Sequence, residues 1–209
     1  MKGSKIMKKK YQVFISSTYR DLQEERAVVI QCLLEMGCIP VGMEQFPASN
    51  MSQMEYIKMM MDDCDYYVLI LAGKYGTLDA DGIGFTEKEY DYALEKKIPV
   101  MSFVIKDREA LPDIKKEDTE EKRNKLDDFQ RKVCREKLVK FYTNKDELRG
   151  NVAVSLNSCI KTFPALGWER GNSIEEQEDI ESRFEKYMEK HCVLKNGMEI
   201  ILDGGNANS

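Results

Sequence analysis

The sequence predicts one α/β domain built on a five-stranded parallel sheet and followed by a C-terminal extension. Short runs rich in β-branched and aromatic residues alternate with helical apolar stripes, a pattern typical of repeated strand–helix–strand units. The run 66–71 (YYVLIL) is apolar throughout, as expected for a central strand that is buried on both faces. A length of 209 residues suits a single well-buried domain with some additional chain at its end.

The strands and helices of the domain follow from these patterns. We expect strands at 11–16, 39–43, 66–71, 98–105 and 138–142. We expect helices at 20–36, around 54–64, at 86–96, around 126–133 and at 146–163, with a charged loop at 106–121. Five such units in this order predict a flavodoxin-like three-layer sandwich whose parallel strands lie in the order 2-1-3-4-5.

The composition also suggests where the domain begins and ends. Residues 1–10 form a short N-terminal extension, 11–170 the α/β domain, and 171–209 a separate C-terminal part. In that part, Ser173-Ile174-Glu175-Glu176 is a capping box that predicts a charged helix. Asn196-Gly197 predicts a hairpin that joins 192–194 to 198–202, and the tail 203–209 is expected to be disordered.

Composition excludes several classes of protein. A net charge of −5 argues against a nucleic-acid partner, and no apolar run is long enough for a signal peptide or a membrane span, so we expect a cytoplasmic protein. Six scattered cysteines without a C-x-x-C pair favour reduced thiols over a disulfide framework or a zinc site. His191 is the single histidine, which excludes Ser-His-Asp and Cys-His mechanisms. Chemistry would therefore depend on carboxylates, hydroxyls and backbone amides, with no metal.

The predicted sheet places any site at one edge. Ligands of doubly wound sheets bind beyond the carboxyl ends of the strands where the winding reverses, here between the first and third strands. The loops 16–21 and 73–84 meet at that point, and the loop 44–50 lies beside them.

Three consecutive hydroxyl residues end the first strand at this edge. Ser16, Ser17 and Thr18 precede a helix, where free backbone N–H groups favour a phosphate or a carboxylate. Alternatively, one of the three simply caps the helix. Arg20 and Arg26 would add positive charge for a phosphate, or would instead pair with the nearby acids Asp21, Glu24 and Glu25.

The glycine-rich loop 73–84 has no standard nucleotide-binding motif. It lacks the Gly-Lys-Ser/Thr ending of a P-loop, and it does not follow the first strand as a dinucleotide fingerprint would. Its alternating aspartates and glycines lack the twelfth-position acid of a calcium loop. The sequence therefore predicts a flexible lid.

The start of the next helix holds the candidate catalytic residue. Thr86-Glu87-Lys88-Glu89 fits a capping box in which Glu89 reaches back to the Thr86 amide. In the competing interpretation, Glu89 lies at the mouth of the crevice opposite Ser16. Without a histidine, a carboxylate is the natural nucleophile or ion-pair stabiliser for a glycosidic carbon that passes through an oxocarbenium-like state.

Five ordered motifs resemble the domain-of-unknown-function family DUF4062. They are 13–22 (VFISSTYRDL), 42–48 (GMEQFPA), 64–70 (CDYYVLI), 85–93 (FTEKEYDYA) and 167–170 (GWER). More distantly, the layout is similar to Toll/interleukin-1-receptor-like (TIR) domains and nucleoside 2-deoxyribosyltransferases. Both place a glutamate on the helix after the third strand, and the transferase pattern Thr-x-x-Glu-x-x-x-Ala falls on Thr86, Glu89 and Ala93.

These resemblances imply an N-glycosidase or ribosyl transferase that acts on NAD or a nucleotide in bacterial stress or anti-phage signalling. Glu89 would be catalytic, and Tyr75 would stack on a base. The expected ligand-binding residues are Ser16, Ser17, Thr18, Arg20, Asp21, Glu44, Gly73, Tyr75, Gly76 and Thr86. The alternatives are a non-catalytic adaptor that assembles with copies of itself, and a receptor that binds a nucleotide signal without turnover.

Overall fold

The computed structural model describes residues 9–42, 51–136, 138–169, 182, 192–195 and 199–202. Contacts divide the chain into two units, Met1–Glu169 and Arg170–Ser209. The strands of the first unit are β1 (Gln12–Ser16), β2 (Ile39–Val41), β3 (Tyr66–Leu71), β4 (Val100–Ile105) and β5 (Val139–Tyr142). Its helices are α1 (Gln23–Glu35), α2 (Gln53–Asp62), α3 (Phe85–Glu95), α4 (Glu120–Glu136) and α5 (Lys145–Thr162), with a 3-10 turn at Asp113–Lys115.

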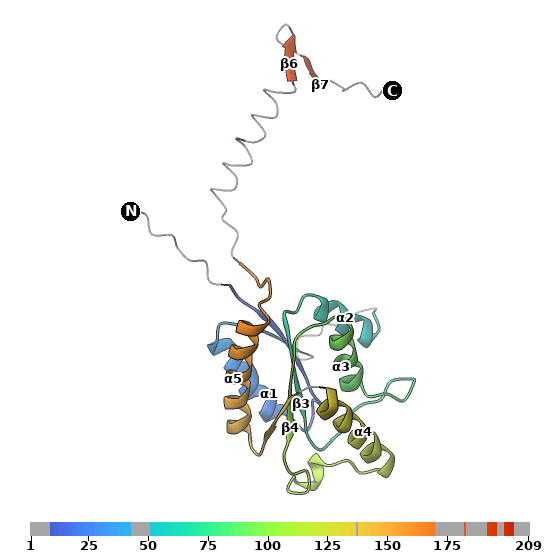
Figure 1. Ribbon diagram of the computed structural model, residues 1–209. Helices are drawn as coiled ribbons and strands as arrows, with labels where there is room; N and C mark the ends of the chain where they lie inside the picture. Colours follow the sequence, from blue (N-terminus) through green and yellow to red (C-terminus); the bar gives the residue numbers. More distant parts are fainter. Residues whose placement is uncertain are drawn as a thin grey trace, which may run out of the picture. The chain divides into compact units, whose positions relative to one another are not determined.

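The five strands form one parallel sheet in the order β2-β1-β3-β4-β5, which confirms the predicted fold. Helices α1 and α5 cover one face of the sheet, and α2, α3 and α4 cover the other (Figure 1). All six residues of β3 are buried, as its apolar sequence predicts. The winding reverses between β1 and β3, so the carboxyl ends of these two strands meet at one edge.

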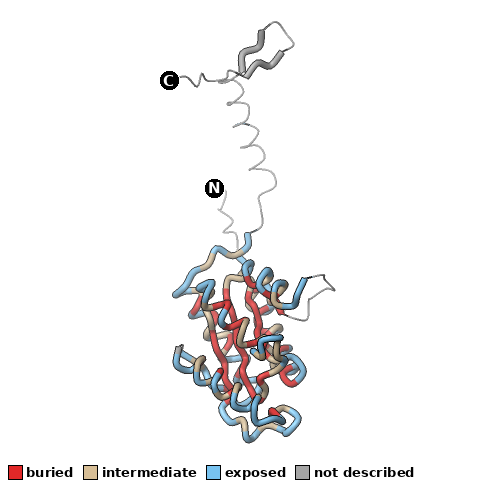
Figure 2. Tube along the Cα trace, turned by 90° about the vertical axis from the view of Figure 1, so that its right-hand side faces the viewer, coloured by how far each residue is buried: buried red, intermediate tan, exposed pale blue. Residues whose placement is uncertain are grey.

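Residues of β1 alternate between the two cores, because successive side chains of a strand point to opposite faces. Val13 and Ile15 belong to the core on the α1 and α5 side, whereas Phe14 belongs to the core on the α2, α3 and α4 side. Figure 2 shows the buried strands at the centre, with exposed segments around them. This alternation decides where the polar side chains at the end of β1 point.

Two of the helix starts that differ from the sequence prediction bear on the site. Helix α1 starts at Gln23 rather than at residue 20, and its N-cap residue, Leu22, makes no side-chain capping hydrogen bond. None of Ser16, Ser17 and Thr18 therefore caps α1. Helix α3 starts at Phe85 with Gly84 as its N-cap.

The second unit contains the predicted hairpin. Strands β6 (Cys192–Lys195) and β7 (Glu199–Leu202) pair antiparallel, with Cys192 opposite Leu202 and Lys195 opposite Glu199. The capping box at 173–176 and the tail 203–209 lie outside the described residues. Within the described segments, no helix combines the length and apolarity that a bilayer span requires.

Asp65 joins the two ends of the α/β unit. Its Oδ2 accepts a hydrogen bond from the backbone N–H of Gln12 at 2.9 Å, and its Oδ1 accepts one from Gly167 at 3.1 Å. Lys10 and Trp168 form an antiparallel bridge beside this contact. One carboxylate thereby satisfies two backbone donors from segments that are far apart in sequence.

We expect Asp65→Ala to lower the free energy of unfolding by about 1–3 kcal/mol, because two partly buried N–H groups lose their acceptor. Urea unfolding followed by circular dichroism measures this change. The matched control is Asp63→Ala at the exposed C-cap of α2, which should change stability by about 0.5 kcal/mol or less. Equal losses in the two variants would contradict this role of Asp65.

Candidate functional site

A cavity of about 710 Å³ opens where the carboxyl ends of β1 and β3 meet. Its volume lies within the roughly 300–1,000 Å³ that small-molecule sites occupy in proteins. It is lined by Ser17, Thr18, Tyr19, Arg20, Asp21, Gln53, Lys74, Gly76, Thr77, Phe85, Thr86, Glu117, Asp118 and Lys122. The cavity thus lies at the sheet edge that the topology indicates.

The predicted site residues fall into four groups. Six of them line the cavity: Ser17, Thr18, Arg20, Asp21, Gly76 and Thr86. Two do not line it and are buried at the end of β1 and on α3: Ser16 and Glu89. Gly73 and Tyr75 also do not line it, and Glu44 lies outside the described residues.

Ser16 and Glu89 form a buried pair between β1 and α3. The Ser16 hydroxyl donates a hydrogen bond to Glu89 Oε2, and only 1% of Glu89 is exposed. Burial raises the pKa of Glu89 to about 7, although the hydrogen bond from Ser16 and the charge of Arg26 lower it. The capping-box interpretation of Glu89 is wrong, because Gly84 is the N-cap of α3 and Glu89 points to β1.

Arg26 reaches the end of β1 from α1. It is 1% exposed, and its Nη1 donates hydrogen bonds to the Ile15 carbonyl at 3.2 Å and to Ser17 Oγ at 2.8 Å. Arg26 does not line the cavity, so its expected contact with a phosphate is not supported. Of the acids that precede it in the sequence, Glu24 pairs with Lys145 and Glu25 with Lys115.

Asp21 brings a mostly buried carboxyl to the cavity wall. It is 9% exposed, and within the described part of the chain its Oδ2 has no hydrogen-bond partner. Burial raises the pKa of Asp21, while a hydrogen bond from Thr18 and the charges of Lys74 and Lys115 lower it.

Tyr75 does not reach the cavity in this structure. Its hydroxyl donates to Glu87 Oε2 at 2.5 Å and accepts from the Gly84 N–H at 3.1 Å, and its ring packs edge-on against Phe129. The side chain is 4% exposed, so the expected stacking on a base would require the core to repack.

Gly73 has a role in packing. A Cβ atom at this position would lie 2.2 Å from the Lys115 carbonyl oxygen, so only glycine allows the two segments to approach this closely. The Gly73 carbonyl also accepts a hydrogen bond from the Glu117 N–H at 3.0 Å. Gly73 therefore helps to bring Glu117 to the cavity.

Hydrogen bonds hold the glycine-rich loop 73–84 at several points, whereas the sequence predicts a flexible lid. Glu117 Oε1 accepts hydrogen bonds from the N–H groups of Tyr75 and Gly76, at 2.6 and 3.2 Å. Lysines on α4 add two further contacts: Lys122 donates to the Gly76 carbonyl and Lys125 to that of Gly82. Lys88 of α3 forms an ion pair with Asp79 of the loop.

The charges on the cavity wall are mixed. Arg20, Lys74 and Lys122 are cationic, and Asp21, Glu117 and Asp118 are acidic. Together with the hydroxyls of Ser17, Thr18 and Thr86, they offer donors for a phosphate and acceptors for sugar hydroxyls.

Several residues that line the cavity were not among the site residues that the sequence predicts. Tyr19, Lys74 and Phe85 adjoin predicted residues in the chain, and including neighbours of each motif would have found them. The segment with Glu117, Asp118 and Lys122 gave no such signal, since its sequence is an ordinary charged stretch that the fold brings to the cavity.

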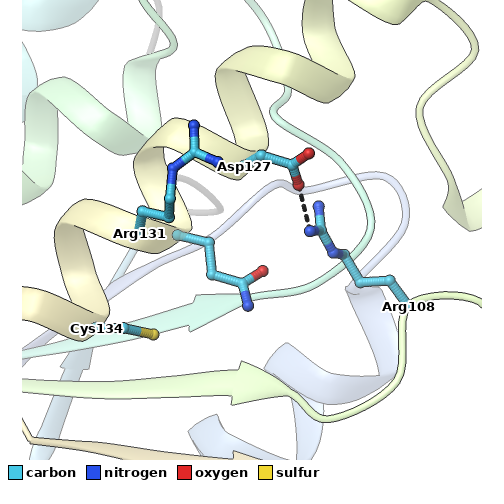
Figure 3. A pocket seen from close by; sticks show the side chains of 5 residues that line it. Arg108, Asp127, Arg131 and Cys134 are labelled. Carbon is cyan, nitrogen blue, oxygen red and sulfur yellow. Dashed lines mark hydrogen bonds and ion pairs between the residues drawn. The ribbon is translucent and has the colours of Figure 1, made fainter.

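A second cavity of about 300 Å³ lies against α4 and is lined by Arg108, Asp127, Gln130, Arg131 and Cys134. In Figure 3, Arg108 points to Asp127, with which it forms an ion pair. Arg131 pairs with Asp128 on its own helix. Because both arginines are already paired with carboxylates, this cavity is the weaker candidate for binding an anion.

Comparisons with known proteins give one family match. The model of a family described as "Domain of unknown function (DUF4062)" matches residues 12–157. No curated protein matches the sequence. One similar solved structure is that of the TIR domains of the activated Roq1 resistosome directly recognizing the pathogen effector XopQ. It has a TM-score of 0.40 and 11% sequence identity, covering 85% of this chain and 99% of that one. Similarity at this level carries no argument about function.

Glu89 should make the stability of the fold depend on pH. Its pKa rises from an ordinary 4.5 to about 7 on folding, so the folded chain binds more protons between these values. The stability contributed by the neutral carboxyl is present at low pH and is lost as the pH rises through 7. Glu89→Gln cannot ionise and should not lose this stability. Near pH 8 its free energy of unfolding should therefore exceed that of the wild type by up to roughly 3 kcal/mol.

Urea unfolding of both proteins from about pH 5 to pH 8 measures this difference. Asp21 titrates in both chains, so its contribution cancels. The exposed Glu95→Gln on the same helix is the matched control and should track the wild type. A pH-independent difference between Glu89→Gln and the wild type would contradict the prediction.

Proposed function

This chain belongs to the DUF4062 family, whose name carries no activity, and we propose that it binds NAD or another nucleotide in the cavity and cleaves the ligand's N-glycosidic bond. One observation supports this proposal most directly. Glu89 has a pKa of about 7 and accepts a hydrogen bond from Ser16, which precedes Ser17 in the chain. It lies one helical turn after Thr86. Both Ser17 and Thr86 line the cavity.

The proposed reaction uses Glu89 as a carboxylate. The bond between the ribosyl C1′ and the base nitrogen breaks, and the electron pair leaves with the base. Ionised Glu89 stabilises the positive charge that develops on the ribosyl group, and water then adds to C1′ and releases one proton. A pKa near 7 leaves a substantial fraction of Glu89 ionised at neutral pH.

The cavity wall supplies contacts for the remaining parts of a nucleotide. Arg20, Lys74 and Lys122 provide cationic groups for phosphate oxygens, and Arg20 has the planar fork that suits them best. Tyr19 is 44% exposed and Phe85 is half-buried, and both line the cavity. These two rings take the place of Tyr75 as the proposed surface for a base.

A receptor without turnover is the second candidate. Two observations favour the receptor: Glu89 is only 1% exposed, and it does not line the cavity. A substrate could therefore touch Glu89 only after residues that line the cavity moved aside. In this role the same cavity would bind the nucleotide, and the bound state would be the signal in a stress or anti-phage response.

The first test incubates the purified full chain, at low and high protein concentration, with NAD and a panel of nucleosides and nucleotides. Chromatography should detect the free base, and Glu89→Gln should reduce its release by roughly 100-fold or more. Glu95→Gln should release base at the wild-type rate.

Binding that is lost in Arg20→Ala, with no turnover in the wild type, would favour the receptor. Loss of base release in Glu95→Gln as well would mean that the effect is not specific to Glu89. If the chain shows neither binding nor turnover at any concentration, the proposed function is overturned and the self-assembling adaptor remains. Sedimentation with and without residues 171–209 tests that adaptor.

The second test concerns the base. Phe85→Ala should weaken nucleotide binding by roughly tenfold while leaving ribose 5-phosphate binding unchanged, because only the nucleotide carries a ring that stacks on Phe85. Calorimetric titration measures both affinities, and Phe85→Tyr, which keeps a ring, is the matched control. Equal weakening for the two ligands would show that Phe85 acts on the shape of the whole cavity.

A further inference from the structure

Two consecutive backbone N–H groups converge on one oxygen beside the cavity. Tyr75 and Gly76 both donate to Oε1 of Glu117, at 2.6 and 3.2 Å. We call these two N–H groups the amide pair. Consecutive N–H groups that point to one place form a concavity that binds anions, phosphates among them. The chain thus fills an anion-binding arrangement of its backbone with its own carboxylate.

The amide pair adjoins the cavity and a cation. Gly76 and Glu117 both line the cavity, as does Lys122 of α4. Lys122 Nζ donates to the Gly76 carbonyl at 3.1 Å, which places its charge next to the pair. A phosphate that took the place of the Glu117 carboxylate would therefore gain hydrogen bonds from the amide pair and charge from Lys122.

The backbone at the amide pair requires a glycine. Gly76 has a φ of +93°, a conformation that residues with a side chain rarely adopt. A Cβ atom at this position would also lie 2.8 Å from Cγ2 of Thr18, in the loop after β1. The amide pair therefore lies close to that loop, whose residues Ser17 and Thr18 line the same cavity.

The Glu117 side chain can leave the amide pair without releasing its own backbone. The Glu117 N–H donates to the Gly73 carbonyl at 3.0 Å, and Arg123 Nη1 donates to the Glu117 carbonyl at 3.0 Å. Neither contact involves the carboxylate. Residue 117 therefore keeps its place beside the loop when the carboxylate moves.

We propose that the amide pair of Tyr75 and Gly76 is a phosphate-binding site, which Glu117 closes until a phosphate displaces its carboxylate. A phosphate group carries more negative charge than a carboxylate and has three strong acceptor oxygens, so it can bind the amide pair and Lys122 together. The inference rests on the proposed function only in taking a nucleotide as the carrier of that phosphate. A nucleoside, which has no phosphate, would leave Glu117 in place.

The test titrates the full chain with inorganic phosphate and follows the backbone amides by nitrogen-15 NMR. Glu117→Ala leaves the amide pair open. Phosphate should therefore shift the Tyr75 and Gly76 signals of this variant with a dissociation constant at least roughly tenfold below that of the wild type. A tenfold change corresponds to a site that Glu117 closes about nine-tenths of the time.

Asp118→Ala is the matched control, because Asp118 also lines the cavity and its loss removes one carboxylate, as Glu117→Ala does. It should tighten phosphate binding by about twofold or less, since Asp118 is exposed and solvent screens its charge. Equal tightening in the two variants would overturn the proposal. So would Tyr75 and Gly76 signals that phosphate leaves unchanged in folded Glu117→Ala.

The wild type answers the same question should Glu117→Ala not fold. At high phosphate concentration its Tyr75 and Gly76 signals should shift and saturate. Signals that stay unchanged at these two residues, with or without a shift at Thr18, would overturn the proposal.

Base release judges the proposed function separately. Phosphate binding at the amide pair without any base release would retain this site and reject cleavage. Base release from a nucleotide, with Tyr75 and Gly76 signals that phosphate does not shift, would reject this site and retain cleavage.

Discussion

The hydrogen bond between Ser16 and Glu89 connects the sheet to the helix layer at the point where the site forms. A carboxyl at 1% exposure is tolerated only where its ionised form gains partners or its neutral form is favoured. Both effects operate here, since burial raises the pKa of Glu89 whereas Ser16 and Arg26 lower it. The resulting value of about 7 reflects burial opposed by these two neighbours. A change in packing that exposed Glu89 or removed the hydrogen bond from Ser16 would therefore alter its pKa.

The cavity depends on a second set of contacts, made by Glu117. Its carboxylate binds two backbone N–H groups of the loop after β3, and its own N–H binds the Gly73 carbonyl. These contacts help to hold Gly76 and Lys74 on the cavity wall, where Gly76 lies against Thr18 of the loop after β1. A carboxylate engaged in this way has less capacity to repel a phosphate, which makes the cationic part of the wall more effective. The acidic residues of the cavity thus contribute to its architecture as well as to its charge.

The sequence predicts the sheet completely in its order and direction, because strand composition and alternation with helices leave few topologies open. It also predicts the edge at which the cavity lies. Two kinds of feature could not be read from it. The direction of Glu89 was ambiguous, since Thr-x-x-Glu fits a capping box equally well until the helix start is known to be Gly84–Phe85. The burial of Tyr75 was also hidden, because a tyrosine in a glycine-rich loop gives no sign that Glu87 and Phe129 will enclose it.

If a ligand reached Glu89 as the proposed function requires, the charge of that ligand would shift the pKa of the carboxyl. A ligand whose ribosyl carbon is joined to a cationic ring, as in a pyridinium nucleotide, would favour the ionised form of Glu89. In the proposed reaction, the same ionised form would stabilise the ribosyl cation as the ring departs, so substrate binding and bond cleavage would draw on one electrostatic preference. A ligand that placed a phosphate near Glu89 would have the reverse effect and favour the neutral carboxyl. Glu89 would thus discriminate among nucleotides by the charge that they bring next to β1.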